Sequence, residues 1–210
     1  MNRKFFDVLL TWPKPYISGV DLCCILDKSS DSRHAIIKRA IQNGEVTPIR
    51  RDLYLIKNSK IPLVNAFEIA PVIYGPSYVS FESALSYHGW IPEAVRTTTC
   101  ASVKRTKEFK TPIGIFSYEH IPIKAFSLGV GQHQQEDSTL FIAAPIKALA
   151  DMIYARKRTW AKIEDLLDDL RIEPESFENS DKELLADLIE NYPSSRVQKA
   201  LQILQKGLIT

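Results

Sequence analysis

The sequence has little of several features that would identify a protein class directly. Its 27 Lys and Arg nearly balance 25 Asp and Glu, so the net charge of +2 indicates no strongly basic or acidic partner. No apolar run approaches the roughly 18 residues of a membrane span, and residues 1–7 lack the apolar core of an export signal. Three cysteines provide no disulfide framework, so we expect a cytoplasmic protein with reduced thiols and no membrane contact.

Signatures of cofactor binding are scarce as well. Gly129 and Gly131 lack the further glycine and the lysine of a phosphate-binding loop. No spacing of His and Cys suits zinc, and the adjacent Cys23 and Cys24 lie in an apolar segment where we expect packed thiols. The sequence therefore predicts neither a cofactor nor a metal.

The sequence also gives little support for a catalytic site built from its serines, acids and histidines. Ser80, Glu82 and His88 have the positions of a helix N-cap, a first-turn acid and a last-turn cation. Asp151 lies in an amphipathic helix, where we expect a solvated side chain. Because no nucleophile, base and orienting group are implied together, we predict that the chain is not an enzyme.

The charge is unevenly distributed along the chain. Residues 1–60 contain 11 cations and 6 anions, a net charge of +5, whereas residues 129–210 have a net charge of −4. Sampling over short windows could produce such a difference, but a basic segment followed by an acidic one is also typical of an anion-binding module joined to a second domain.

Residues 1–60 have the pattern of a winged helix-turn-helix. The sequence predicts helices over 4–12, 20–26 and 31–42 and hairpin strands over 45–49 and 53–56. Ser18 with Asp21 forms a capping box for the second helix, Ser30 caps the third, and Asn43-Gly44 ends it. Helices followed by a hairpin are the order of a winged DNA-binding domain, which we assign to residues 1–60.

The third helix has one apolar face and one polar face. We expect the apolar face, Ile36, Ile37, Ala40 and Ile41, to pack on the first two helices. The predicted DNA-binding residues are Ser32, Arg33, His34, Lys38, Arg39 and Gln42 on the helix, with Arg50 and Arg51 at the hairpin tip. The alternatives are an ordinary solvated helix or a winged helix that docks a protein partner.

For residues 61–210 we predict an α+β domain, which is joined to the first domain by a polar connector at 58–62. We expect a helix over 63–74, a second helix from Ser80 to about His88, and a small antiparallel sheet between 95 and 118. Residues 129–138 have the composition of a surface loop. A strand over 140–144 precedes helices from Pro145, over 159–171, over 181–191 and over 195–206. The basic residues Lys104, Arg105, Lys107 and Lys110 fit a solvated strand, and less well a nucleic-acid surface.

Two motifs resemble the AbiEi-type regulators of bacterial abortive-infection loci. The first is the hairpin Arg50-Arg51-Asp52-Leu53-Tyr54, and the second is residues 77–93, SYVSFESALSYHGWIPE. The segments 104–118 and 144–151 are also similar, so that the resemblance covers most of residues 15–155. The family pattern often has glycine where this chain has Asp52.

The resemblance implies an antitoxin that is also a transcriptional regulator. Its N-terminal domain would bind double-stranded DNA at inverted repeats in its own promoter and repress it, with two copies of the chain on one site. The domain 61–210 would be required to neutralise a nucleotidyltransferase-like toxin without forming a stable complex with it.

Overall fold

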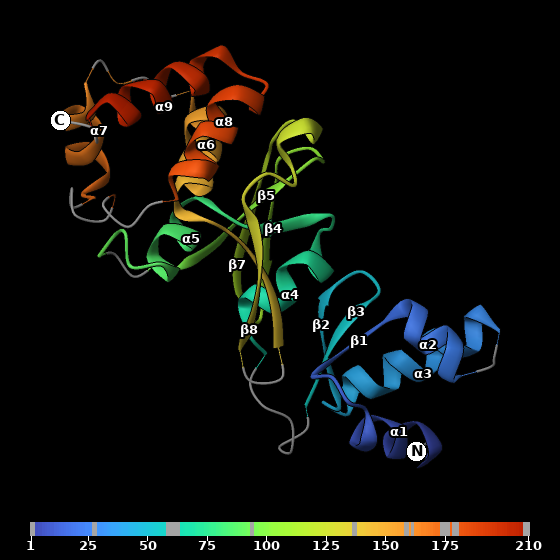
Figure 1. Cartoon of the computed structure of the whole chain (residues 1–210). Coiled ribbons are helices and arrows are strands. Elements are labelled where there is room, and N and C mark those ends of the chain that lie inside the picture. The colour runs from blue at the N-terminus through green and yellow to red at the C-terminus, as the bar shows by residue number, and fades with distance from the viewer. Residues whose placement is uncertain are drawn as a thin grey trace. The chain divides into compact units, whose positions relative to one another are not determined.

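The computed structural model describes residues 3–26, 29–57, 64–92, 95–135, 138–157, 160, 162–172, 177 and 181–207 (Figure 1). The chain divides into two compact units, and the first comprises Met1–Ile69 with Thr111–Ile113. The second comprises Ala70–Lys110 with Gly114–Thr210. Helices and strands occur largely in separate runs along the chain, which confirms the predicted α+β class. The expected connector at 58–62 lies outside the described residues, and so does the predicted domain border at 60/61.

The first unit combines three helices with a small antiparallel sheet. Its elements are α1 (Arg3–Thr11), β1 (Tyr16–Ser18), α2 (Gly19–Ile25), α3 (Ser30–Gln42), β2 (Val46–Arg50) and β3 (Leu53–Ile56). The strand order is β1-β3-β2, and both pairs are antiparallel. The hairpin β2–β3 is the predicted one. The sequence does not predict β1, because three residues are too few to show an alternating pattern.

Side-chain caps fix where α2 and α3 begin. The Ser18 hydroxyl accepts a hydrogen bond from the Asp21 amide, and the Asp21 carboxylate accepts one from the Ser18 amide at 2.8 Å, which confirms the capping box. The cap of α3 is Ser29 rather than the expected Ser30, because Ser29 Oγ accepts from the amide of Ser32 at 3.4 Å. Two serines stand side by side, and only the geometry distinguishes them.

The core of the first unit forms where the apolar faces of the three helices meet the sheet. Ile36, Ile37 and Ala40 of α3 are buried as predicted, together with Phe5, Leu9, Ile17, Leu22, Leu26, Val46 and Ile56. Ile41 is 38% exposed, which corrects the prediction that it packs inside. At 100° per residue Ile41 lies at the margin of the buried face, so it is only partly covered.

The second unit is built on a six-stranded sheet. Its strands are β4 (Ser77–Val79), β5 (Thr97–Ser102), β6 (Lys107–Thr111), β7 (Gly114–His120), β8 (Val130–Gln135) and β9 (Ser138–Ala143). Their order is β6-β7-β5-β4-β9-β8. This sheet is larger than expected and mixed rather than antiparallel, because β5 pairs with β7 and β4 with β9 in parallel. β6 takes the edge position, so β7 returns beside β5 in the same direction.

The segment predicted as a surface loop, residues 129–138, contains strand β8. Six register pairs, from Val130↔Ala143 to Gln135↔Ser138, join β8 to β9 in an antiparallel hairpin. The prediction was wrong because a strand at the edge of a sheet, with largely exposed side chains, does not need apolar alternation.

Helices pack on this sheet and on one another. They are α4 (Ala66–Ile73), which crosses the division between the units, α5 (Phe81–Tyr87), η1 (Ile123–Ala125), α6 (Pro145–Arg156), α7 (Ile163–Leu170), α8 (Lys182–Asn191) and α9 (Ser195–Gly207). Pro145 opens α6 as predicted. α8 and α9 pack against α6 (Figure 1). α9 buries its predicted face of Val197, Leu201 and Leu204.

Candidate nucleic-acid interface

The outer face of α3 carries the polar side chains singled out in the sequence. Ser32, His34, Lys38, Arg39 and Gln42 are exposed, and Arg33 is half-buried. The apolar face described above holds the helix against α1 and α2, so its orientation fixes which residues point outward. The result is a polar helix face with several cations that no part of the described first unit covers.

The hairpin tip presents two more arginines. Both Arg50 and Arg51 are exposed, and the side chain of Arg51 is 95% accessible. Asp52 completes the turn with a φ of 58°, a left-handed conformation that Asp tolerates better than most residues. Its carbonyl oxygen accepts a hydrogen bond from the Gly19 amide at 2.8 Å, which ties the tip to the start of α2.

A cleft of about 450 Å³ joins the helix to the hairpin tip. Its lining includes Arg33 and His34 from α3 together with Arg50 and Arg51 from the tip. Four of the eight predicted residues therefore meet around one hollow. The other four, Ser32, Lys38, Arg39 and Gln42, are not part of that lining but lie on the exposed surface of α3. The lining also contains Asp52, whose carboxylate lies 3.7 Å from Arg51 Nε. Cations grouped in this way from the helix and the hairpin can attract a polyanion.

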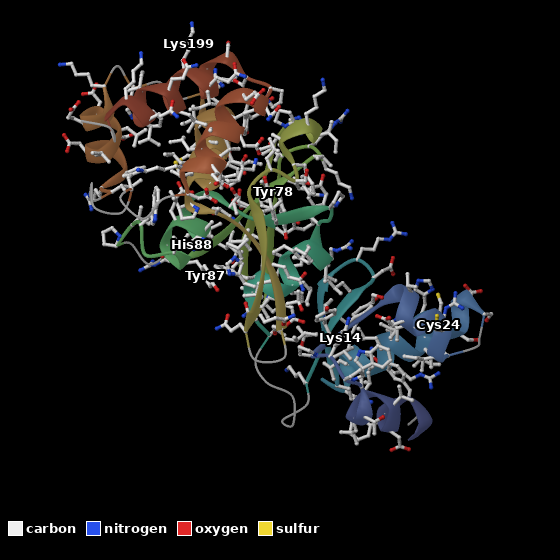
Figure 2. All side chains as sticks on the ribbon, viewed as in Figure 1. Lys14, Cys24, Tyr78, Tyr87, His88 and Lys199 are labelled. Carbon is white, nitrogen blue, oxygen red and sulfur yellow. The ribbon has the colours of Figure 1, made fainter. Side chains whose placement is uncertain are left out.

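Sequence reasoning misplaced the two adjacent cysteines of α2. Both Cys23 and Cys24 are exposed, and Figure 2 shows Cys24 at the outer surface of the helix. On this seven-residue helix only Leu22 is buried, so the next two side chains turn away from the core. Cys23 lines the cleft, as does Val20, which is 74% exposed. A helical projection of residues 19–25 places Val20, Cys23 and Cys24 away from the buried Leu22.

In the second unit, Ser80, Glu82 and His88 do not form one site. Ser80 has the N-cap position, but its hydroxyl donates to Asp151 Oδ2 at 2.9 Å instead of capping the helix. Glu82 forms a two-pronged ion pair with Arg156, with one bond at 2.6 Å. His88 Nε2 lies 3.0 Å from the Ala143 carbonyl oxygen, and burial lowers the pKa of His88. Burial therefore disfavours the positive charge expected of a last-turn cation.

Asp151 is fully buried, which corrects the expectation of a solvated side chain. Its Oδ1 accepts from Lys147 Nζ at 2.5 Å and from Tyr192 at 3.1 Å, and its Oδ2 accepts from Tyr78 at 2.8 Å and from Ser80. Burial raises the pKa of both tyrosines, which remain protonated donors. Lys147 lies four residues away on the same helix, but the three hydroxyl donors lie far from Asp151 in the sequence, so only the fold reveals them. Four donors saturate the carboxylate, which fits a structural role joining β4, α6 and the end of α8.

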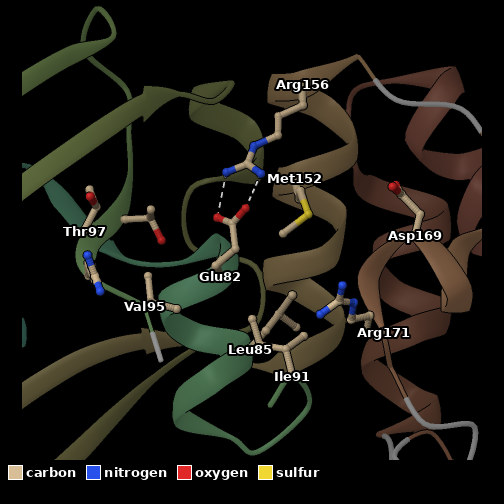
Figure 3. Close-up of a pocket in the computed structure, with 11 residues that line it drawn as sticks. Glu82, Leu85, Ile91, Val95, Thr97, Met152, Arg156, Asp169 and Arg171 are labelled. Carbon is tan, nitrogen blue, oxygen red and sulfur yellow. Dashed lines mark hydrogen bonds and ion pairs between the residues drawn. The ribbon is translucent and has the colours of Figure 1, made fainter. Parts of the chain in front are cut away.

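A larger cavity, of about 600 Å³, lies within the second unit (Figure 3). Apolar side chains of Leu85, Ile91 and Met152 line one part of it, and Arg156 with Glu82 lies beside them. Arg156 also approaches Glu119 at 3.6 Å, and burial raises the pKa of that carboxyl. The paired charges hold the guanidinium in place. The lining also contains Arg96, Arg171 and Asp169, so this pocket, like the cleft of the first unit, has more cations than anions.

Comparison of the chain with models of known protein families and with curated proteins finds no match in either case. Over the residues that the structure describes, no cluster of three His, Cys, Asp or Glu side chains is placed to hold a metal ion. In the same part of the chain, no helix is long and apolar enough to cross a membrane.

Proposed function

We propose that this protein is a sequence-specific DNA-binding transcriptional regulator that reads duplex DNA with its first unit. The order of the elements supports the proposal: α1, β1, α2, α3 and the hairpin β2–β3 follow one another as in a winged helix-turn-helix. In such a domain the third helix enters the major groove and the hairpin lies along the backbone or the adjacent minor groove.

One observation carries the proposal. The start of α3 and the hairpin tip face the same cleft, and each contributes cations to it, Arg33 from the helix and Arg50 and Arg51 from the tip. Arginine can contact phosphates and the edge of guanine, and the exposed Gln42 is a suitable side chain for adenine. The helix then specifies the sequence, and the tip positions the domain on the backbone.

The test is DNA affinity measured across a range of salt concentrations. A duplex from the chain's own upstream region is titrated with the wild type and with R50A/R51A. Each lost phosphate contact lowers the slope of log K against log salt by about one, so the double variant should lose a slope of about two. A matched control is K182A/K199A, which removes the same charge from exposed positions on α8 and α9.

The control should bind as the wild type does. An unchanged slope in R50A/R51A, or equal losses in both double variants, would contradict the proposal. The first result would show that the tip does not touch DNA, and the second that only the total charge matters.

The proposal also includes autorepression and antitoxin activity. Both are supported by the resemblance to AbiEi-type proteins. We propose that the chain represses its own promoter and that residues 61–210 counteract a nucleotidyltransferase-like toxin. Co-expression with a toxin encoded by the neighbouring gene tests this part: growth should recover with the full chain and not with residues 1–60 alone. Toxicity that persists with the full chain would contradict it.

A second candidate function is protein docking by the same unit. Val20, at 74% exposure, gives the cleft an apolar rim that a protein partner could cover. A V20N variant, which makes the rim polar without adding charge to the cleft, separates the two functions. It should abolish capture of a protein partner if docking is the role. If DNA binding is the role, the variant should still bind the duplex, and R50A/R51A should still weaken that binding.

A further inference from the structure

The two edges of the six-stranded sheet differ in charge. β6 at one edge has the sequence KEFKT, with three charged residues in five. β8 at the other edge has the sequence VGQHQQ, with no Lys, Arg, Asp, Glu or Pro. Charged residues and proline are the usual means by which an exposed edge avoids pairing with another strand. By this criterion β6 is protected and β8 is open.

The backbone of β8 offers hydrogen-bonding groups on its outer side. The Ala144 amide donates to the Gly129 carbonyl at 2.8 Å, and in an antiparallel pair such bonded positions recur at every second residue. Gln132 and Gln134 fall between the bonded positions, so their N–H and C=O groups point away from β9. In the described part of the chain, no other strand occupies that side of β8.

Aromatic side chains flank this edge on both faces of the sheet. Phe141 of β9 stands opposite Gln132 in the register and is 44% exposed. His133 points to the other face, where its ring lies 5.6 Å from that of Tyr87, which is 41% exposed. An incoming strand would therefore gain backbone bonds and would also cover apolar surface above and below the sheet.

We infer that β8 pairs with β8 of a second copy of this chain, antiparallel, about a two-fold axis at Gln132. A strand without charge can meet an identical strand without repulsion, and a two-fold interface requires such self-complementarity. Centring on Gln132 places its outward groups opposite their own copies and pairs Val130 with Gln134 of the second copy. The inference rests on the proposed function in one respect: two copies are needed to read an inverted repeat.

The first test is the mass of the protein in solution without DNA. Light scattering after gel filtration should give twice the 23.8 kDa of one chain for the wild type. Q132K places two ammonium groups opposite each other and should weaken the dimer roughly tenfold or more. Q202K makes the same replacement at an exposed position of α9 and should leave the dimer unchanged. A wild-type monomer at every concentration measured, or equal effects of both variants, overturns the inference.

Cross-linking tests the register and does not depend on the stability of Q132K. In a C23S/C24S background, Q132C places two cysteines opposite each other at a Cα distance of about 5.5 Å, within the range of a disulfide. Mild oxidation should give a covalent dimer, while K110C on the charged edge should not. A dimer that Q132C fails to trap contradicts the register. Because these measurements contain no DNA, loss of DNA binding would contradict the proposed function and leave this inference standing.

Discussion

Replacing Asp151 by Asn should destabilise the protein severely, although the two side chains have nearly the same size. The carboxylate is the 2.5 Å partner of Lys147, whose side chain is 0% exposed, and it accepts three hydroxyl hydrogen bonds as well. Removing one partner of a buried ion pair costs about 3–5 kcal/mol, because the other charge is left uncompensated. We expect D151N to lose that much of the free energy of unfolding, measured by urea denaturation.

A second replacement separates the charge effect from simple packing. K147M/D151N removes the orphaned ammonium, so the double variant should be more stable than D151N alone. D168N, at an exposed position on α7, should stay within about 0.5 kcal/mol of the wild type. A loss below about 1 kcal/mol in D151N, or a double variant less stable than the single one, would contradict an uncompensated buried charge at Lys147.

The pH dependence of D151N provides a further signature. Burial lowers the pKa of Lys147, and Asp151 opposes that effect. Without the carboxylate, the folded state binds fewer protons than the unfolded state, whose lysine titrates near pH 10.4. The stability of D151N should therefore rise with pH toward about 10.4, and more steeply than that of the wild type. Parallel pH profiles would contradict this account.

Three further predictions concern individual side chains. Burial lowers the pKa of His88, so the folded state binds fewer protons than the unfolded state below about pH 6.5, and stability falls with acidification through that range. Urea denaturation of H88Q at pH 7 and pH 5 should show a smaller loss than in the wild type, and an equal loss would contradict it. D52N keeps a residue that tolerates the φ of 58° but removes a negative charge from the hairpin tip, so it should bind the upstream duplex more tightly than the wild type does, and an unchanged or weaker affinity would contradict this. Cys23 and Cys24 should react with a thiol reagent in the folded protein, whereas the buried Cys100, whose pKa burial raises, should react only after unfolding; three fast thiols would be inconsistent with the fold.

The main helices and the hairpin of the first unit are predictable from the sequence because their signals are local. A capping box at Ser18 and Asp21, the apolar spacing of α3 and the turn at Asp52 each depend on a few neighbouring residues. The exposure of Lys38 and Arg39 follows from the same helical spacing. The meeting of Arg33 with Arg50 and Arg51 around one cleft does not, because it depends on how α3 and the hairpin pack together.

The second unit shows where local signals fail. β8 is rich in glutamine and reads as a loop, since the hydrogen bonds that make it a strand come from β9. Asp151 has the spacing of a solvated helix face, yet it is buried by Tyr78 and Tyr192, which lie 73 and 41 residues away. A charged residue at the centre of a long-range network has no signature in a helical projection.

Sequence-specific DNA binding by the first unit underlies the proposed regulatory function. The decisive measurement is the ratio of Kd values for the chain's own upstream duplex and a scrambled duplex of equal length, at one physiological salt concentration. We predict that the wild type prefers its own sequence by a factor of about 10³ or more, and that K38A/Q42A on α3 reduces this ratio while R50A/R51A weakens both duplexes alike. Equal affinity of the wild type for the two duplexes would contradict the claim.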